Sequence, residues 1–238
     1  NNPVAGVNVT FAIVNGGGTT SPPSGSTVAT DAAGIAALTS WTLGTTAGLN
    51  SLTATVAGLT GSPITFTATG TTGAATQMTT TVGAQTATVN TPVSTDPSVL
   101  VTDANNNPVS GVSVTFAVTA GGGSISSPSG STVVTNASGI AALSTWTLGT
   151  TAGANSIQAT SPGLPTVNFT ATGTAGPATS ISVNAGNGQS ATVGTAVAID
   201  PSVSVRDAYN NPVTLTNVVF TVVSGGGSTL PGSPATRQ

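Results

Sequence analysis

Apolar and polar residues alternate along several short stretches of the chain. In residues 112–118, valine or phenylalanine occupies every even position, and serine, threonine or alanine occupies every odd one. A period of two is typical of a β-strand with one buried face. The stretch follows Asn106-Asn107-Pro108, which favours a turn because Asn tolerates left-handed backbone and Pro presets φ. The pattern therefore predicts a turn followed by a half-buried strand.

This stretch occurs three times in the chain. Near-copies of residues 106–116 begin at Asn1 and at Asn210, which lie 105 residues before and 104 residues after Asn106. This spacing fits a small all-β domain with turn signals between short strands. We therefore expect an all-β fold built as a tandem array of antiparallel Greek-key sandwiches, with one complete and two partial repeats.

The repeats divide the chain into three domains. Residues 1–72 contain the C-terminal part of a domain, residues 74–175 a complete domain and residues 176–238 the N-terminal part of a third. Residues 35–43 and 140–148 are each predicted to form one long strand. The third domain is predicted to stop after its fourth strand, which contains Val218, Phe220 and Val222.

Neither partial domain can close a sandwich alone. Two explanations remain open. The chain is a piece of a longer array, which we favour, or neighbouring copies supply the missing strands through main-chain hydrogen bonds.

The composition restricts the chemistry that the chain can perform more than it restricts the fold. There are 2 basic residues, and all 5 acidic residues are Asp, while Lys, Glu, His and Cys are absent. Without an imidazole, thiolate or amine, the usual catalytic bases, nucleophiles and soft metal ligands are missing, so we expect no enzyme and no cofactor. Two arginines cannot form a basic surface for nucleic acid. No apolar run reaches the length of a membrane span, so this segment is not expected to insert.

Two sets of residues carry a family resemblance. Residues 101–112 (Val-Thr-Asp-Ala-Asn-Asn-Asn-Pro-Val-Ser-Gly-Val) and residues 135–141 followed by 146–153 resemble the bacterial Ig-like repeats of the invasin and intimin type, or Big-1-like repeats. The resemblance covers the whole chain, in one complete and two partial units. The resemblance implies an Ig-like sandwich that serves as a spacer or stalk in surface adhesins and extracellular fibres.

From this resemblance and the composition we expect an extracellular or cell-surface structural protein. Its predicted function is a structural repeat segment of a bacterial filament, sheath or adhesin stalk. The alternative is an adhesin module that binds a glycan or a host protein. Aromatic-rich, divergent loops would favour the alternative, whereas the loops here contain few aromatic residues and are nearly identical between copies.

Four aspartates recur in pairs. Asp96 and Asp103 are repeated as Asp200 and Asp207. One interpretation is a Ca²⁺ ion held at a domain junction by these carboxylates and by turn carbonyls. The other is that each Asp forms an Asx-turn at a strand end. Because Ca²⁺ normally takes six to eight oxygen ligands and each repeat offers two carboxylates, the turn is preferred.

The large aromatic residues recur at matching strand positions. They are interpreted as core or interface residues, and stacking of a sugar on the tryptophans is the alternative. The set comprises Trp41, Trp146, Phe11, Phe116, Phe220, Phe66 and Phe169.

The surface is nearly uncharged. Asn-x-Ser/Thr sequons at Asn8, Asn136 and Asn168 make surface glycans an option. Soluble β proteins commonly protect edge strands with Lys, and this chain has none. We therefore expect the array to self-associate, laterally or end to end.

Overall fold

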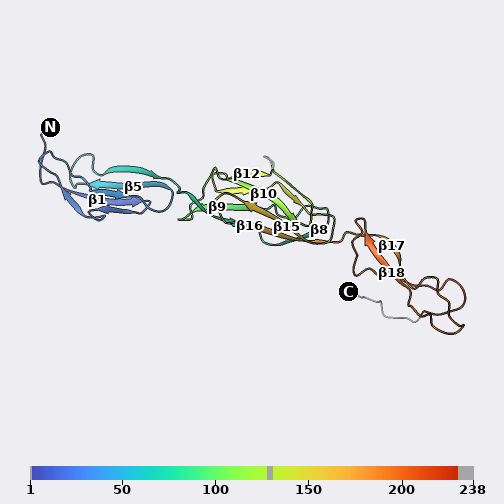
Figure 1. The fold of residues 1–238 in the computed structure, drawn as a ribbon. Coiled ribbons are helices and arrows are strands. Elements are labelled where there is room, and N and C mark those ends of the chain that lie inside the picture. The colour runs from blue at the N-terminus through green and yellow to red at the C-terminus, as the bar shows by residue number, and fades with distance from the viewer. Residues whose placement is uncertain (1, 128–130, 230–238) are drawn as a thin grey trace.

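The computed structural model describes residues 2–127 and 131–229, and in them every regular element is a β-strand. The three copies follow one another along an elongated molecule (Figure 1). We call residues 2–70 the first unit, residues 75–174 the middle unit and residues 178–229 the third unit. The all-β class predicted from the alternation is confirmed. Asn1 and residues 230–238, which the sequence assigned to the outer domains, lie outside the described residues.

The middle unit contains three sheets. One sheet has the order β12-β10-β15-β16-β8, a second has the order β13-β9-β7, and β11 pairs with β14. All pairs are antiparallel except β16 with β8, which is parallel. The strands are β7 Ala75–Thr80, β8 Gln85–Thr88, β9 Ser98–Asp103, β10 Ser113–Ala120, β11 Ser124–Ser126, β12 Thr132–Val134, β13 Ile140–Ala142, β14 Thr145–Thr147, β15 Gly153–Thr160 and β16 Val167–Thr174.

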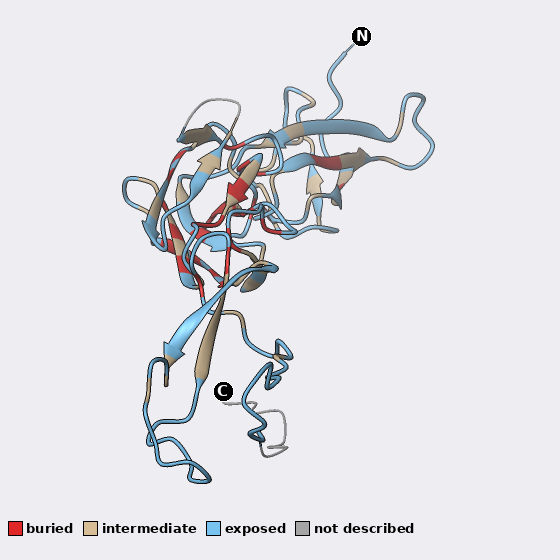
Figure 2. Cartoon of the chain, turned by 90° about the vertical axis from the view of Figure 1, so that its right-hand side faces the viewer, coloured by how far each residue is buried: buried red, intermediate tan, exposed pale blue. Residues whose placement is uncertain are grey.

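Alternation along the strands builds the core of the middle unit. Along β10, Val114 and Phe116 are buried while Ser113 and Thr115 are exposed. The Phe116 ring lies against that of Phe169 on β16, with centroids 6.3 Å apart. Figure 2 shows that buried segments concentrate in this unit. The side chains that fill the core include Met78, Val99, Val101, Leu143, Trp146, Leu148 and Ile157.

The long strand predicted for residues 140–148 is wrong in detail. The segment is divided at Leu143 and Ser144 into β13, which pairs with β9, and β14, which pairs with β11. The chain thus passes from one sheet to another within this stretch. A continuous run of strand-forming residues could not reveal the change, because it depends on which strands lie beside each half.

The first unit repeats the second half of the middle unit. Its larger sheet has the order β3-β1-β5-β6, and β2 pairs with β4. Here β13 has no counterpart strand, and only residues 40–42 of the predicted 35–43 strand are formed. The strands are β1 Asn8–Asn15, β2 Thr19–Ser21, β3 Thr27–Ala29, β4 Ser40–Thr42, β5 Gly48–Thr55 and β6 Ile64–Gly70.

The third unit repeats the beginning of the middle unit. β17 (Ala178–Ala185) and β18 (Ser202–Asp207) form an antiparallel pair, which we call the ribbon. The predicted fourth strand around Val218 and Phe220 is not formed, because residues 208–229 contain no strand. A lone strand pair leaves no sheet beside which that segment could align.

Candidate functional site: the joints between units

The three units are connected by two joints with the same construction. The first links β6 to β7 through residues 71–74, and the second links β16 to β17 through residues 175–177. At each joint an Asp ends a strand of the following unit, Asp103 on β9 or Asp207 on β18. These carboxylates are buried, with 2% and 4% of their surface exposed.

The Asp carboxylate at each joint is held by several hydrogen-bond donors. In the first joint, Oδ1 of Asp103 accepts from the backbone N–H groups of Asn105 and Asn107, at 2.8 and 2.9 Å. Its Oδ2 accepts from the linker N–H of Gly73 at 2.8 Å and from Asn107 Nδ2 at 3.0 Å. The carboxylate therefore ties the linker to the turn that follows β9.

The second joint reproduces these contacts. Asp207 Oδ1 accepts from the N–H groups of Tyr209 and Asn211, at 2.8 and 2.9 Å. Asp207 Oδ2 accepts from the Gly176 N–H and from Asn211 Nδ2, both at 2.9 Å. The agreement shows that the same four residue positions build both turns.

At each joint, an asparagine side chain forms hydrogen bonds to the preceding unit. Asn107 Oδ1 accepts from the N–H of Ala47 at 2.8 Å, and its Nδ2 donates to the carbonyl of Thr45 at 2.8 Å. Asn211 makes the same pair of bonds to Ala152 and Thr150, both at 2.8 Å. One side-chain amide thus pairs with the donor and acceptor of the preceding unit as a backbone peptide would. We call each arrangement of Asp, Asn and receiving loop a clasp.

The receiving loop is held in place by a buried asparagine of its own unit. Asn155, which is 1% exposed, accepts from the Gly149 N–H at 3.0 Å and donates to the Gly153 carbonyl at 3.1 Å. Asn50, which is fully buried, bonds in the same way to Gly44 and Gly48 at 3.1 Å each. Each buried asparagine therefore holds both ends of the loop whose middle residues meet the next unit.

Hydrogen bonding determines the charge state of both aspartates. Bonds from the Asn107 side chain and from the Gly73 N–H lower the pKa of Asp103 from 3.8 to about 2, against the opposing effect of burial. Burial raises the pKa of Asp207, but bonds from the Asn211 side chain and the Gly176 N–H outweigh it and lower the pKa to about 2. Both clasps therefore contain a carboxylate at neutral pH.

The paired aspartates are not brought together. Asp96 precedes β9 and Asp103 ends it, so the carboxylates lie about 20 Å apart along an extended strand. Asp200 and Asp207 flank β18 in the same way. No cluster of three or more possible metal-ligating side chains occurs in residues 2–127 and 131–229. The bonds to Asp103 and Asp207 are those of Asx-turns.

The aromatic residues fall into two groups. In the middle unit Phe116, Phe169 and Trp146 are buried, with Trp146 fully enclosed. In the first unit Phe11 is buried and Trp41 is half-buried. Phe66 and Phe220 are about half exposed, at 46% and 47%, and do not lie in a core.

The three sequons lie at exposed positions. Asn8 is on β1, Asn168 is on β16 and Asn136 is in a turn. The Oδ1 of Asn136 accepts from the N–H groups of Ser138 and Ile140, at 2.9 and 3.1 Å, as an Asx-turn.

Sequence reasoning missed the residues that cross the joints. Asn107 and Asn211 stand in Asn-Asn-Pro stretches, which were interpreted as turn chemistry alone, and Asn50 and Asn155 were given no role. The recurrence of these asparagines at offsets of 104 and 105 residues was the signal that could have identified them.

Comparison with known proteins places this fold among bacterial Ig-like domains. No protein-family model matches the chain, and no curated protein sequence does. Among solved structures, the Escherichia coli adhesin FdeC is similar over 90% of this chain and 67% of that one, with 22% identity and a TM-score of 0.52. The expected tandem Ig-like fold is thereby confirmed, and the sequence resemblance is confirmed at the level of fold.

Two further neighbours have lower scores. Invasin, a bacterial integrin-binding protein, is matched over 91% of this chain and 42% of its own, with 19% identity and a TM-score of 0.41. The D00-D0 domain of intimin is matched over 73% of this chain and 96% of its own, with 14% identity and a TM-score of 0.34.

In the described part of this chain, no helix could cross a membrane.

Proposed function

We propose that this chain is a spacer segment of a bacterial surface fibre or adhesin stalk, located outside the cell and able to self-associate. The observation that carries the proposal is the repetition of the clasp. The four bonds across the two joints all have a length of 2.8 Å, and the receiving loops, residues 44–48 and 149–153, have the same sequence. Because the clasps fix the orientation of successive domains, the length of the array increases with the number of domains.

The composition supports a mechanical and non-catalytic role. The sequence contains no His, Cys, Lys or Glu, and its two most strongly perturbed carboxylates are engaged within the clasps. FdeC is an adhesin and resembles this chain over most of its length. The composition thus favours a structural over a catalytic role, and loops that contain few aromatic residues and are nearly identical between copies favour the spacer over a ligand-binding module.

The proposal predicts a narrow range of distances across a joint. Because the chain has no Cys, spin labels can be attached at Thr67→Cys and Thr170→Cys, which are exposed and occupy equivalent strand positions in neighbouring units. Double electron–electron resonance should give one narrow distance distribution. The Asn107→Ala substitution should broaden it, since both bonds to the first unit are lost.

Asn105→Ala is the matched control. Asn105 lies in the same exposed turn, and of its groups only the backbone N–H joins the clasp. This variant should leave the distribution narrow. A distribution that is already broad in the parent chain would contradict the spacer function.

A further inference from the structure

The turn that follows β18 differs from its counterpart after β9 at two positions. Residues 205–213 repeat residues 101–109 except for Arg206 and Tyr209, which replace a threonine and an asparagine. Both turns form the same hydrogen bonds around their Asp carboxylates, so neither replacement is needed for the clasp. The two new side chains therefore have another use in this turn.

Tyr209 forms a hydrogen bond to the middle unit. Its hydroxyl accepts from Asn90 Nδ2 at 2.6 Å, although the two residues are 119 positions apart in the sequence. Asn90 lies in the turn after β8, whereas the side chain of Asn211 bonds to the loop of residues 149–153. The third unit is thus attached to a segment of the middle unit that the clasp does not contact.

The attachment point on the middle unit is held in place by its own unit. Asn90 has a left-handed backbone, with φ +59°, which Asn adopts more readily than most residues. Its N–H donates to the Gly149 carbonyl at 3.0 Å, and the Leu148 N–H donates to the carbonyl of Thr91 at 3.0 Å. Val89, directly before it, is 2% exposed. The Asn90 amide therefore extends from a fixed turn.

Arg206 stabilises the turn on the other side of the contact. Its Nη1 donates to the Asn210 carbonyl at 2.7 Å, next to Tyr209 in the chain. The Tyr209 N–H donates to Asp207 Oδ1 at 2.8 Å. The backbone that carries the phenol ring is therefore held by a bond on each side.

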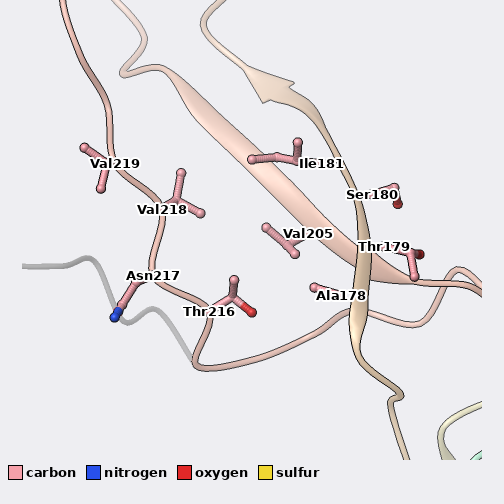
Figure 3. A pocket seen from close by; sticks show the side chains of 9 residues that line it. All are labelled: Ala178, Thr179, Ser180, Ile181, Val205, Thr216, Asn217, Val218 and Val219. Carbon is pink, nitrogen blue, oxygen red and sulfur yellow. The ribbon is translucent and has the colours of Figure 1, made fainter.

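The ribbon connects this turn to the rest of the third unit. Arg206 on β18 is the Cα partner of Ser180 on β17, and its carbonyl accepts from the hydroxyls of Thr179 and Ser180, at 3.4 and 3.5 Å. Figure 3 shows Thr179 and Ser180 on β17, alongside Val205 on β18. A contact at Tyr209 therefore acts on both strands of the ribbon.

We propose that the bond between Tyr209 and Asn90 fixes the rotation of the third unit relative to the middle unit. This inference rests on the spacer function proposed above and names the residues that set the orientation at one joint. The linker and the Asn211 clasp attach the third unit at two places, and a body attached at two places can still turn about the line between them. The Tyr209 bond supplies a third place and removes this rotation.

Spin labels across the second joint test the proposal. Thr79 on β7 and Thr170 on β16 are exposed on different sheets of the middle unit, and Ser182 is exposed on β17. Thr79→Cys/Ser182→Cys and Thr170→Cys/Ser182→Cys chains should each give one narrow distribution in double electron–electron resonance. Tyr209→Phe keeps the ring and loses the hydroxyl. In this variant the share of distances outside the main peak should rise about fivefold, which is the effect of losing one hydrogen bond between neutral groups.

Substitutions at Asn90 separate this bond from the folding of its turn. Asn90→Gly tolerates the positive φ but removes the amide, so it should broaden both distributions as Tyr209→Phe does. Asn90→Asp keeps an oxygen that can accept from the Tyr209 O–H, and both distributions should stay narrow. Tyr209→Asn gives the turn the residue that Asn105 supplies at the first joint, so it should retain the clasp and still broaden both distributions.

The results distinguish this inference from the spacer function. Equally narrow distributions in the parent and in Tyr209→Phe would overturn the inference and leave the spacer function in place. Broad distributions across the second joint of the parent would do the same if the Thr67–Thr170 distances across the first joint are narrow. Broad distances across both joints would contradict the spacer function and this inference together. Broadening in Tyr209→Phe but not in Asn90→Gly would overturn the role of Asn90.

Discussion

At the scale of single residues, two side chains decide how neighbouring units meet. A carboxylate that accepts hydrogen bonds from four donor groups fixes the turn after the strand, and this turn directs one asparagine amide toward the preceding unit. Bonds to a charged acceptor are stronger than bonds between neutral groups. The ionised form of Asp103 is therefore part of the joint.

Acid should loosen the joints in a defined pH range. The pKa of Asp103 and of Asp207 is about 2 in the folded chain, below the value of about 3.9 for an unfolded Asp. A lowered pKa means that the stabilisation is fully present above about pH 4 and is lost as the pH falls toward 2. The label distances across the first joint should be narrow at pH 7 and broaden between pH 4 and 2.

Asp103→Asn supplies the control for this titration. An amide at this position keeps one oxygen acceptor but cannot carry the charge. Its label distances should be broad already at pH 7 and change little on acidification. Narrow distances in this variant at neutral pH would show that the carboxylate is not required.

At the scale of strands and turns, the glycine triplet of the middle unit positions the loop that receives the clasp. Gly123 has φ +85°, and a Cβ there would lie 2.2 Å from the Thr147 carbonyl oxygen. Gly122 has φ +73°, but a Cβ there would meet nothing within 4 Å. Positive φ is thus shared by both positions, and the close backbone approach occurs only at Gly123.

The two glycines should therefore respond differently to alanine. Gly122→Ala should cost about 1–2 kcal/mol, which is the cost of a left-handed conformation for a residue with a Cβ. Gly123→Ala should cost at least about 3 kcal/mol, because the backbone must also move. Denaturant unfolding, followed by Trp146 fluorescence in a Trp41→Phe background, measures both. Equal losses would show that steric contact at Gly123 is unimportant.

Strands were predicted correctly where apolar–polar alternation in the sequence coincides with a neighbouring strand in the structure. β10 shows the burial alternation expected from residues 112–118. Residues 35–37 and 140–142 are identical in sequence, yet only the second set forms a strand, because β9 lies beside it. Phe66 and Phe169 differ in burial for the same reason. Pairing and cover are properties of the neighbouring segments and cannot be inferred from the local pattern.

The joints were partly predictable. The Asx-turns at Asp103 and Asp207 follow from short-range turn chemistry, which the sequence contains. The bonds from Asn107 to Thr45 and Ala47 span about sixty residues, and no local signal identifies such a partner. Only the recurrence of the whole arrangement at the second joint could have suggested it.

At the scale of the whole molecule, apolar surface rather than charge is available for association. The chain carries 2 Arg and 5 Asp, while Ile64, Phe66 and Val193 are among its exposed apolar side chains. Screening by salt weakens contacts between exposed charges but not apolar burial. The association constant should change less than about threefold between 20 and 500 mM NaCl, as measured by sedimentation. A tenfold decrease would indicate a charged interface instead.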